Sequence, residues 1–366
     1  MKGKHLYIDS DSRLLIEIRK RVNDGLQVNL SSTKTKHWLK FIFYVGLSIV
    51  LYLLLYAHSS PLVFILNYIT LGLTLLLFAF NFAHDFSHNA VFENKGWNNF
   101  SFIAIYTLVG AHAEAWRERH VNSHHFAPNV KEYDTDLQIT NLIRVSPDMI
   151  FKWYHKYQFI YAPFAYSTYS LYWIFIKDPI VLLKSIRNSK VNLPYVLSFL
   201  VQKSFYILYI LVLPLLFAQQ SIGTILLGFL IMHLIQSVFL LFTFFMTHHV
   251  LETTYPETDK NGVIQISWLM NQISSSNDMH PFSEIANFLL GGFNNHIAHH
   301  LFPHLSHIHY PRLNKILYRI LKNHGITPNQ TTYFGGVISH LKLLKKLSKK
   351  TAHNNGYSAY PSGYAP

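Results

Sequence analysis

Three short stretches of the sequence place histidines at spacings that suit metal binding. Their eight histidines are His84 and His88 in HDFSH, His120, His124 and His125 in HVNSHH, and His296, His299 and His300 in HIAHH. Residues three or four apart on a helix lie on one face, about one turn from each other. Eight neutral nitrogen donors exceed the three or four that one zinc ion takes, so we predict a site for two metal ions.

The composition of the rest of the chain predicts a membrane protein. Half of the residues are hydrophobic and only 13% are charged, against about 25% charged in soluble domains. Two runs, 41–84 and 204–251, contain no Asp, Glu, Lys or Arg. Each run is long enough for two bilayer crossings of about 20 residues, and polar turns at 58–61 and 218–221 divide them. We therefore expect an all-α integral membrane protein with four transmembrane helices in two hairpins, a cytosolic helical cap and interfacial helices.

The basic residues lie outside the two hairpins and predict which side of the membrane the rest of the chain occupies. The net charge is +13, and the basic clusters nearest to the hairpins are Lys34, Lys36 and Lys40, then Lys184, Arg187 and Lys190, and finally the lysines of 342–350. By the positive-inside rule, both termini and the metal site should face the cytoplasm of a bacterial inner membrane or the endoplasmic reticulum. This pattern indicates a membrane face and not a nucleic-acid-binding surface. The absence of Cys excludes disulfides and thiolate-bound metals.

The hairpins divide the chain into three expected parts. Residues 1–40 form a cytosolic amphipathic lead, and 351–366 form a tail whose Gly, Pro, Ser and Asn content predicts disorder. Residues 41–350 form the membrane domain, with hairpins at 41–83 and 194–248 and cytosolic cap segments at 84–193 and 249–350. The segment 100–116 has too few apolar residues to cross a bilayer. The segment 157–176 is rich in Tyr and Trp, which is typical of the headgroup region. We therefore expect both segments to form interfacial helices. A third pair of crossings is the alternative.

The ligand type alone leaves the metal open, because imidazole suits iron, copper, zinc and nickel. Iron is favoured by the surroundings, since a site fed by the bilayer would meet hydrocarbon chains. Attack on an unactivated C–H bond requires an oxidant made from dioxygen, which redox-silent zinc cannot supply. We therefore expect two iron ions with O2 as co-substrate, and a zinc hydrolase with all-histidine ligands is the chemical rival.

The residues that flank the histidines are more specific than the spacing of the histidines. They read NFAHDFSH, then WRERHVNSHHFAPN followed by DTD at 134–136, then WLMNQISSSN at 268–277, and finally GGFNNHIAHHLFPHLSHIHYP. Over roughly 75–315 the sequence thereby resembles the membrane fatty acid desaturase family, and in particular its acyl-lipid and front-end branch.

This resemblance implies four transmembrane helices under a cytosolic cap, two irons bound by histidines, and a fatty acyl lipid or acyl-CoA substrate. By position in the family motifs, the metal ligands would be the eight histidines above and a ninth histidine at the base of the fourth helix. MTHHVLE offers His248 and His249 for that ninth position, and the register of HVLE favours His249. The expected reaction removes two hydrogens from adjacent methylenes of an acyl chain, with O2 reduced to water.

The sequence departs from the family pattern in two places. Front-end members usually carry Gln where this chain has His296, which leaves regioselectivity open. Many members are fused to a cytochrome haem domain with a His-Pro-Gly-Gly motif that this sequence lacks. Because GxGxxG is absent as well, we expect electrons from a separate ferredoxin or cytochrome-type donor with its reductase. A basic cytoplasmic face would attract such an acidic carrier.

Several polar residues near the motifs or inside the crossings also carry predictions. Asp85 or Asp134 could accept the second ring N–H of a ligand histidine, with a solvated surface position as the alternative. His233 should hydrogen-bond a neighbouring helix, and Lys203 should reach the interface as an anchor.

The residues are also compatible with two rival functions. A lipid or carotenoid hydroxylase would need the same two irons and dioxygen, and would return an oxygen atom to the substrate. A metal-handling membrane protein, a carrier or a sensor, would need acids or histidines along the crossings.

Overall fold

The computed structural model describes residues 4–26, 30–138 and 140–350, so the tail predicted at 351–366 lies outside the described residues. The chain divides into two compact units. We call the first the spanning unit, formed by Leu30–Arg117 and Pro163–Leu241. The second, the histidine unit, is formed by Met1–Asn29, Glu118–Ala162 and Phe242–Pro366.

Four helical segments are long and apolar enough to cross a membrane, as the sequence predicts. They are Lys34–Leu54, Pro61–Ser87, Leu193–Phe217 and Ile222–His248. The helices that build them are α2 (Leu30–Leu54), α3 (Pro61–Phe78) with α4 (His84–Ser87), α10 (Leu193–Ile207) with α11 (Leu213–Phe217), and α12 (Ile222–His248). The first and second segments, and the third and fourth, are joined by turns at the two predicted positions. The fold class is therefore an all-α membrane protein.

Two of the crossings are interrupted by a single π-helical turn. The turn η1 (Ala79–Ala83) joins α3 to α4, and the N–H of His84 donates to the carbonyl of Ala79. The turn η6 (Leu208–Val212) precedes Pro214 in α11; because proline has no N–H and its ring crowds the preceding turn, a wider turn there avoids the clash. A π-turn inserts one residue and so re-aims the side chains that follow it, which at η1 are those of His84 and His88.

The helices between the two hairpins are shorter. They are α5 (Lys95–Leu108), α6 (Ala113–Arg119), α7 (Gln158–Ser167), α8 (Tyr169–Tyr172), the π-turn η5 (Trp173–Lys177) and α9 (Asp178–Arg187). Neither 100–116 nor 157–176 supplies one of the four candidate spans in the described part of the chain.

The expectation that Lys203 reaches the membrane interface is wrong. Its side chain is buried and its Nζ lies 2.7 Å from Asp178 Oδ2 and donates to the Gly110 carbonyl at 2.6 Å. Asp178 also accepts from the backbone N–H of His112 at 2.8 Å. Because a buried charge is costly unless it is paired and hydrogen-bonded, the carboxylate at the start of α9 keeps this lysine inside the spanning unit.

The histidine unit consists of short helices and two pairs of parallel two-residue strands. Its N-terminal and central elements are β1 (Lys4–His5), α1 (Asp9–Leu26), the π-turn η2 (His120–His124), and the 3-10 turns η3 (Thr135–Gln138) and η4 (Trp153–Tyr157). Its C-terminal elements are β2 (Val263–Ile264), α13 (Trp268–Ser274), β3 (Asp278–Met279), α14 (Glu284–Leu290), α15 (His296–Leu301), η7 (His307–His309), α16 (Tyr310–Asn323), β4 (Gln330–Thr331) and α17 (Tyr333–Leu347). β1 pairs with β2, and β3 pairs with β4.

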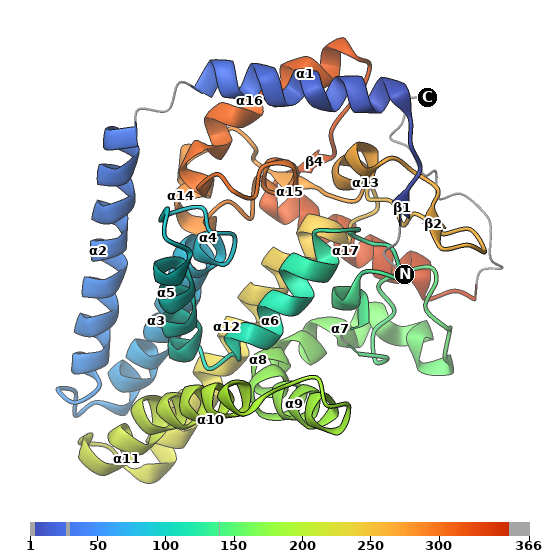
Figure 1. Ribbon diagram of the computed structural model, residues 1–366. Helices are drawn as coiled ribbons and strands as arrows, with labels where there is room; N and C mark the ends of the chain where they lie inside the picture. Colours follow the sequence, from blue (N-terminus) through green and yellow to red (C-terminus); the bar gives the residue numbers. More distant parts are fainter. Residues whose placement is uncertain (1–3, 27–29, 139, 351–366) are drawn as a thin grey trace. The chain divides into compact units, whose positions relative to one another are not determined.

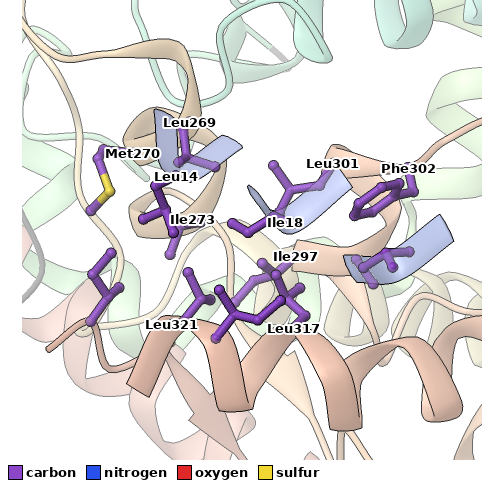
Figure 2. Close-up of a cluster of buried hydrophobic side chains, with 14 of the residues drawn as sticks. Leu14, Ile18, Leu269, Met270, Ile273, Ile297, Leu301, Phe302, Leu317 and Leu321 are labelled. Atoms are coloured by element: carbon purple, nitrogen blue, oxygen red, sulfur yellow. The ribbon is translucent and has the colours of Figure 1, made fainter. Parts of the chain in front are cut away.

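One apolar core holds the N-terminal helix to the helices that carry and flank the third histidine motif. In α1, buried residues recur every fourth position at Leu14, Ile18, Val22 and Leu26, which is the spacing of a helix with one buried face. This face packs against α13 and α16. Figure 2 shows Leu14 and Ile18 of α1 among side chains from α13, α15 and α16.

We expect the Ile18→Ala variant to lower the stability of the histidine unit by about 2–5 kcal/mol, because a buried isoleucine leaves a cavity when it is truncated. The matched control is Ile16→Ala in the same helix, because Ile16 is 67% exposed and Ile18 is 0% exposed. Thermal unfolding of the detergent-solubilised protein should show a clear loss of Tm for Ile18→Ala and almost none for the control. Equal shifts for both variants would contradict the packing described for α1.

Candidate metal centre

Four buried histidines from separate parts of the histidine unit converge. They are His124 at the end of η2, His248 at the end of α12, and His296 and His300 of α15, and each offers a ring nitrogen within 4.8 Å of the others. Nε2 of His248 lies 2.9 Å from Nε2 of His124 and 3.1 Å from Nε2 of His300. The second and third histidine motifs therefore meet at one point, as the sequence predicts.

The other ring nitrogen of three of these histidines faces an oxygen. Nδ1 of His124 donates to Asp134 Oδ2 at 2.9 Å, and Nδ1 of His248 donates to the carbonyl oxygen of Ser275 at 2.7 Å. Nδ1 of His300 donates to Gln272 Oε1 at 2.8 Å. A neutral imidazole carries one proton, so a ring that donates through Nδ1 presents a bare lone pair at Nε2.

The lone pair of His248 faces those of His124 and His300 at 2.9 and 3.1 Å, an arrangement that a cation between them stabilises. A single extra proton could join only one pair of nitrogens, because a proton bridges two atoms. A metal ion held at roughly 2.0–2.1 Å from each imidazole nitrogen leaves neighbouring ligand atoms about 3 Å apart, which matches the observed separations. The residues present therefore fit a metal ion bound by histidine Nε2 atoms.

A second set of imidazoles gathers beside the first in the same unit. Nε2 of His125 lies 3.2 Å from Nε2 of His120 and 2.9 Å from Nε2 of His299. The rings of His120 and His299 are stacked, with their centroids 5.9 Å apart. Behind this set, the hydroxyl of Tyr310 lies 3.4 Å from Nδ1 of His299. These contacts offer donors for a second metal ion.

The first histidine motif belongs to the spanning unit. His84 opens α4 and His88 follows its last residue, and their rings lie edge to face with centroids 5.2 Å apart. The two imidazoles therefore lie close together, as their spacing in the sequence predicts.

The position at the base of the fourth crossing differs from the sequence-based preference. The geometry places His248, and not His249, in the converging set. Nδ1 of His249 instead lies 3.0 Å from the hydroxyl of Tyr255, and its carbonyl accepts from Nδ1 of His340 at 2.7 Å. Consecutive residues at a helix end point about 100° apart, so only one of the two can face the other imidazoles.

Burial and nearby charges both shift the pKa values of the buried imidazoles. Burial alone would lower the pKa of His124, but the charge and the hydrogen bond of Asp134 outweigh it and raise that pKa. Burial, reinforced by His340, lowers the pKa of His249 well below its usual value. Asp134 thus favours a well-donating Nδ1–H on His124, which is the role predicted for one of the acids near the motifs.

Sequence reasoning missed the oxygens that face His248 and His300. Both come from one short segment, since Gln272 lies in α13 and Ser275 is its C-cap residue. The motif WLMNQISSSN contains both residues, but the sequence alone does not indicate that they hydrogen-bond histidines. Asn129 was missed as well: its Nδ2 donates to the carbonyl of His248 at 2.9 Å and its backbone N–H donates to Asp134 Oδ2 at 2.9 Å.

The N-terminal segment holds α13 in place. The hydroxyl of Ser267, which caps α13, donates to Asp11 Oδ2 of α1 at 2.5 Å. Nε2 of His5 lies 3.1 Å from Oδ1 of Asn271, whose Nδ2 donates to the Pro128 carbonyl at 2.9 Å. The residues that orient His248 and His300 are therefore anchored from both the N-terminal lead and the second histidine motif.

A buried carboxylate fixes the start of α15. Oδ1 of Asp278 accepts from the backbone N–H of Ile297 at 2.9 Å, and Oδ2 accepts from the hydroxyl of Tyr318 at 2.9 Å. Burial raises the pKa of Asp278 to about 7, against the opposing effect of these hydrogen bonds. A carboxylate is a suitable partner for the open N–H groups at a helix start, so Asp278 sets the position of the helix that carries three of the histidines.

His233 of α12 behaves as predicted and lies in the spanning unit. Its Nδ1 is 2.8 Å from the hydroxyl of Ser170 and its Nε2 is 2.8 Å from the hydroxyl of Tyr206. Both ring nitrogens are engaged by neighbouring helices, which leaves this histidine a structural role.

We expect His248→Ala to lose bound metal and His249→Ala to keep the wild-type metal content. Only His248 directs Nε2 at the other imidazoles, although both residues are buried and adjacent. Elemental analysis of the purified variants measures the difference, and size-exclusion chromatography confirms that each variant is folded. Retention of metal by His248→Ala together with its loss from His249→Ala would reverse the assignment.

We also expect Asp134→Asn to weaken metal binding by about 10–100-fold, since the charge that supports Nδ1–H of His124 is removed while an acceptor oxygen remains. Glu132→Gln removes the same charge from an exposed side chain nearby and serves as the control. Competition with a metal-sensitive chelator gives both dissociation constants. Equal affinities for the two variants would show that Asp134 does not support the ligand.

The sequence matches known proteins over most of its length. The fatty acid desaturase family matches residues 59–332. The sn-1 linoleoyl-lipid 6-desaturase of Arthrospira platensis is 27% identical over 289 residues, which cover 78% of this chain and 78% of that protein. The acyl-lipid (8-3)-desaturase of Physcomitrium patens is 32% identical over 305 residues, which cover 81% of this chain and 63% of that protein.

A more distant match is fatty acid desaturase 3 of Homo sapiens, which is 24% identical over 271 residues, 72% of this chain and 57% of that protein. The chain thus spans less than two thirds of the human and Physcomitrium patens proteins. The family match includes all three histidine motifs and three of the four candidate spans, and it begins after the first span, Lys34–Leu54. This membrane protein therefore belongs to the fatty acid desaturase family of oxidoreductases.

Proposed function

We propose that the protein is a dioxygen-dependent desaturase that binds two iron ions through histidines and introduces a double bond into the acyl chain of a lipid. The observation that carries the proposal is the convergence of bare Nε2 atoms from His124, His248 and His300 in a buried site of a fatty acid desaturase. The family supports the reaction, and the donor set supports the metal.

The proposed ligands of the first ion are His124, His248, His296 and His300. For the second ion we assign His120, His125 and His299, whose Nε2 atoms gather beside the first set. The assignment of His84 and His88 to the second ion rests on the sequence motif that contains them. His248 takes the position that the sequence had suggested for His249.

Bound iron would supply the reduction of O2 that is needed to break unactivated C–H bonds. The overall reaction balances when two adjacent methylenes lose one hydrogen atom each, and one O2 with two external electrons and two protons yields two waters. Asp134, Gln272 and the Ser275 carbonyl hold each imidazole in one tautomer and one orientation. Because small displacements at a reacting centre change rates strongly, this rigid support also helps to select which methylenes react.

An acyl chain esterified in a lipid is the favoured substrate form, because the relatives from Arthrospira platensis and Physcomitrium patens carry acyl-lipid or lipid in their names. Acyl-CoA is the alternative carrier. The basic residues that flank the hairpins support a cytoplasmic position for both termini and for the metal centre. The two external electrons are assigned to a ferredoxin or cytochrome-type donor with its reductase.

Expression in a host that lacks the expected polyunsaturated lipids should produce a new double bond, located by mass spectrometry of the lipids. His300→Ala should abolish the product because a converging Nε2 is lost. His304→Ala, four residues further on, is the matched control since His304 is exposed and outside the centre. Removal of iron with a chelator should abolish turnover of the purified protein, and Fe(II) but not Zn(II) should restore it.

Several outcomes of this experiment would contradict the proposal. Unchanged unsaturation with iron loaded and an electron donor supplied would exclude desaturation. A product that gains one oxygen atom in place of losing two hydrogens would identify a lipid or carotenoid hydroxylase. Metal flux across vesicles without any lipid change would identify a metal-handling protein.

A further inference from the structure

We propose that the exposed basic face of α16 docks an acidic one-electron carrier protein that reduces the metal centre. This basic face consists of Arg312, Lys315, Arg319 and Lys322. The proposal rests on the proposed function, since each double bond formed with one O2 requires two electrons from outside the substrate. A one-electron carrier must therefore dock twice in each turnover.

The pattern of α16 separates a buried apolar face from the basic one. Leu313, Leu317 and Leu321 recur every fourth residue and are fully buried in the core of the histidine unit. The four basic residues follow one another at intervals of three, four and three, so they share the opposite side of the helix. All four are exposed. In Figure 1, α16 runs beside α1, which packs against it.

The C-terminal part of the sequence supplies no acidic side chain that could balance the positive charge of this face. Beyond Glu284 the sequence contains no Asp or Glu, and every later charged residue is Lys or Arg. On the neighbouring helix α1, Glu17 is already engaged by Arg21 at 2.8 Å and by His324 at 3.0 Å. Within the described ranges, none of the four basic residues forms an ion pair. A cluster of one sign on a small surface attracts a partner of the other sign and accelerates its association.

The same helix leads directly to the metal ligands. Tyr310, its first residue, is buried, and its hydroxyl lies 3.4 Å from Nδ1 of His299. Behind it, α16 packs against α15, which carries His296, His299 and His300. Gly292, in the turn before α15, permits the close approach of Tyr310, because a Cβ at its position would lie 2.9 Å from the Tyr310 ring. A carrier on the basic face would thus be separated from the histidine-bearing helix by one helix diameter, about 10 Å.

Anionic lipid headgroups have charge that would also suit this face. The position of α16 favours a protein carrier, because the helix joins the exposed charges to a ligand of the centre through Tyr310. Contact with lipid would make no use of that connection. Binding of anionic lipid to this face is one outcome of the test.

The test compares two double charge reversals in the full-length, iron-loaded protein in lipid nanodiscs. Lys315→Glu with Arg319→Glu reverses two charges on the basic face of α16. Lys184→Glu with Arg187→Glu makes the same change on α9, where both side chains are also exposed. Turnover is measured with a plant-type [2Fe–2S] ferredoxin, its reductase and NADPH, and the series is repeated with a soluble cytochrome haem domain.

We expect the α16 variant to raise the KM for at least one of the two carriers tenfold or more at low salt, with kcat at saturating carrier nearly unchanged. The dependence of that KM on salt should become flatter, because fewer charges take part in association. The α9 variant should behave as wild type. Turnover driven by dithionite and a small mediator should be the same in all three proteins, because it needs no docking.

Direct binding of each carrier, titrated without turnover, tests docking independently of the reaction. Unchanged dissociation constants of both carriers for the α16 variant would overturn the proposal, as would equal losses in the α9 variant. Unchanged carrier binding together with lost binding to phosphatidylserine vesicles would assign the face to lipid. If the wild-type protein forms no double bond even with dithionite, the proposed function fails, while the binding titration still decides the docking proposal.

Discussion

Imidazole nitrogens that face one another at about 3 Å are the constraint on which the histidine unit depends. Their lone pairs repel one another unless a cation lies between them, so the fold must hold them together against that repulsion. It does so from behind each ring, through Asp134 on His124, the Ser275 carbonyl on His248 and Gln272 on His300. Each acceptor fixes both the direction of the ring and the nitrogen that carries the proton.

The supports of these acceptors explain why so many polar side chains are buried in this unit. Asn129 ties the end of α12 to the second histidine motif, and Asn277 donates from Nδ2 to the carbonyl of Met246 at 2.8 Å. Asn314 of α16 donates to Asn295 Oδ1 at 2.8 Å, beside the start of α15. A satisfied hydrogen bond adds only about 1 kcal/mol, but loss of one partner costs about 1–3 kcal/mol. Such a network contributes more to a defined geometry than to total stability.

The spanning unit shows the same dependence on polar contacts made at specific points. The π-turn at Ala79–Ala83 aims the residues that follow it, and His84 and His88 come directly afterwards. Lys203, Asp178 and the Gly110 carbonyl form a buried group that joins α10 to α9 and to the loop before α6. In an apolar environment these few hydrogen-bonded charges define where helices meet, since apolar contacts alone specify position weakly.

The sequence by itself determined the features that depend on neighbouring residues. Charge-free runs of sufficient length predict the two hairpins. Histidines spaced by one helical turn are predicted to share one face of a helix. Both predictions depend only on residues that follow one another in the sequence. The motifs that resemble the desaturase family predicted the reaction class. One of them, DTD, contains Asp134, which accepts the hydrogen bond from Nδ1 of His124. These inferences needed no knowledge of how distant segments meet.

Only the tertiary structure decided between alternatives that local pattern leaves equal. His248 and His249 are adjacent and chemically identical, and the Ser275 carbonyl, which comes from another segment, meets only the first. Lys203 has a buried partner because Asp178 approaches from a different helix. The physical reason is the same in each case: a hydrogen bond or an ion pair acts over about 3 Å, and residues far apart in the chain reach that distance only once the helices have packed.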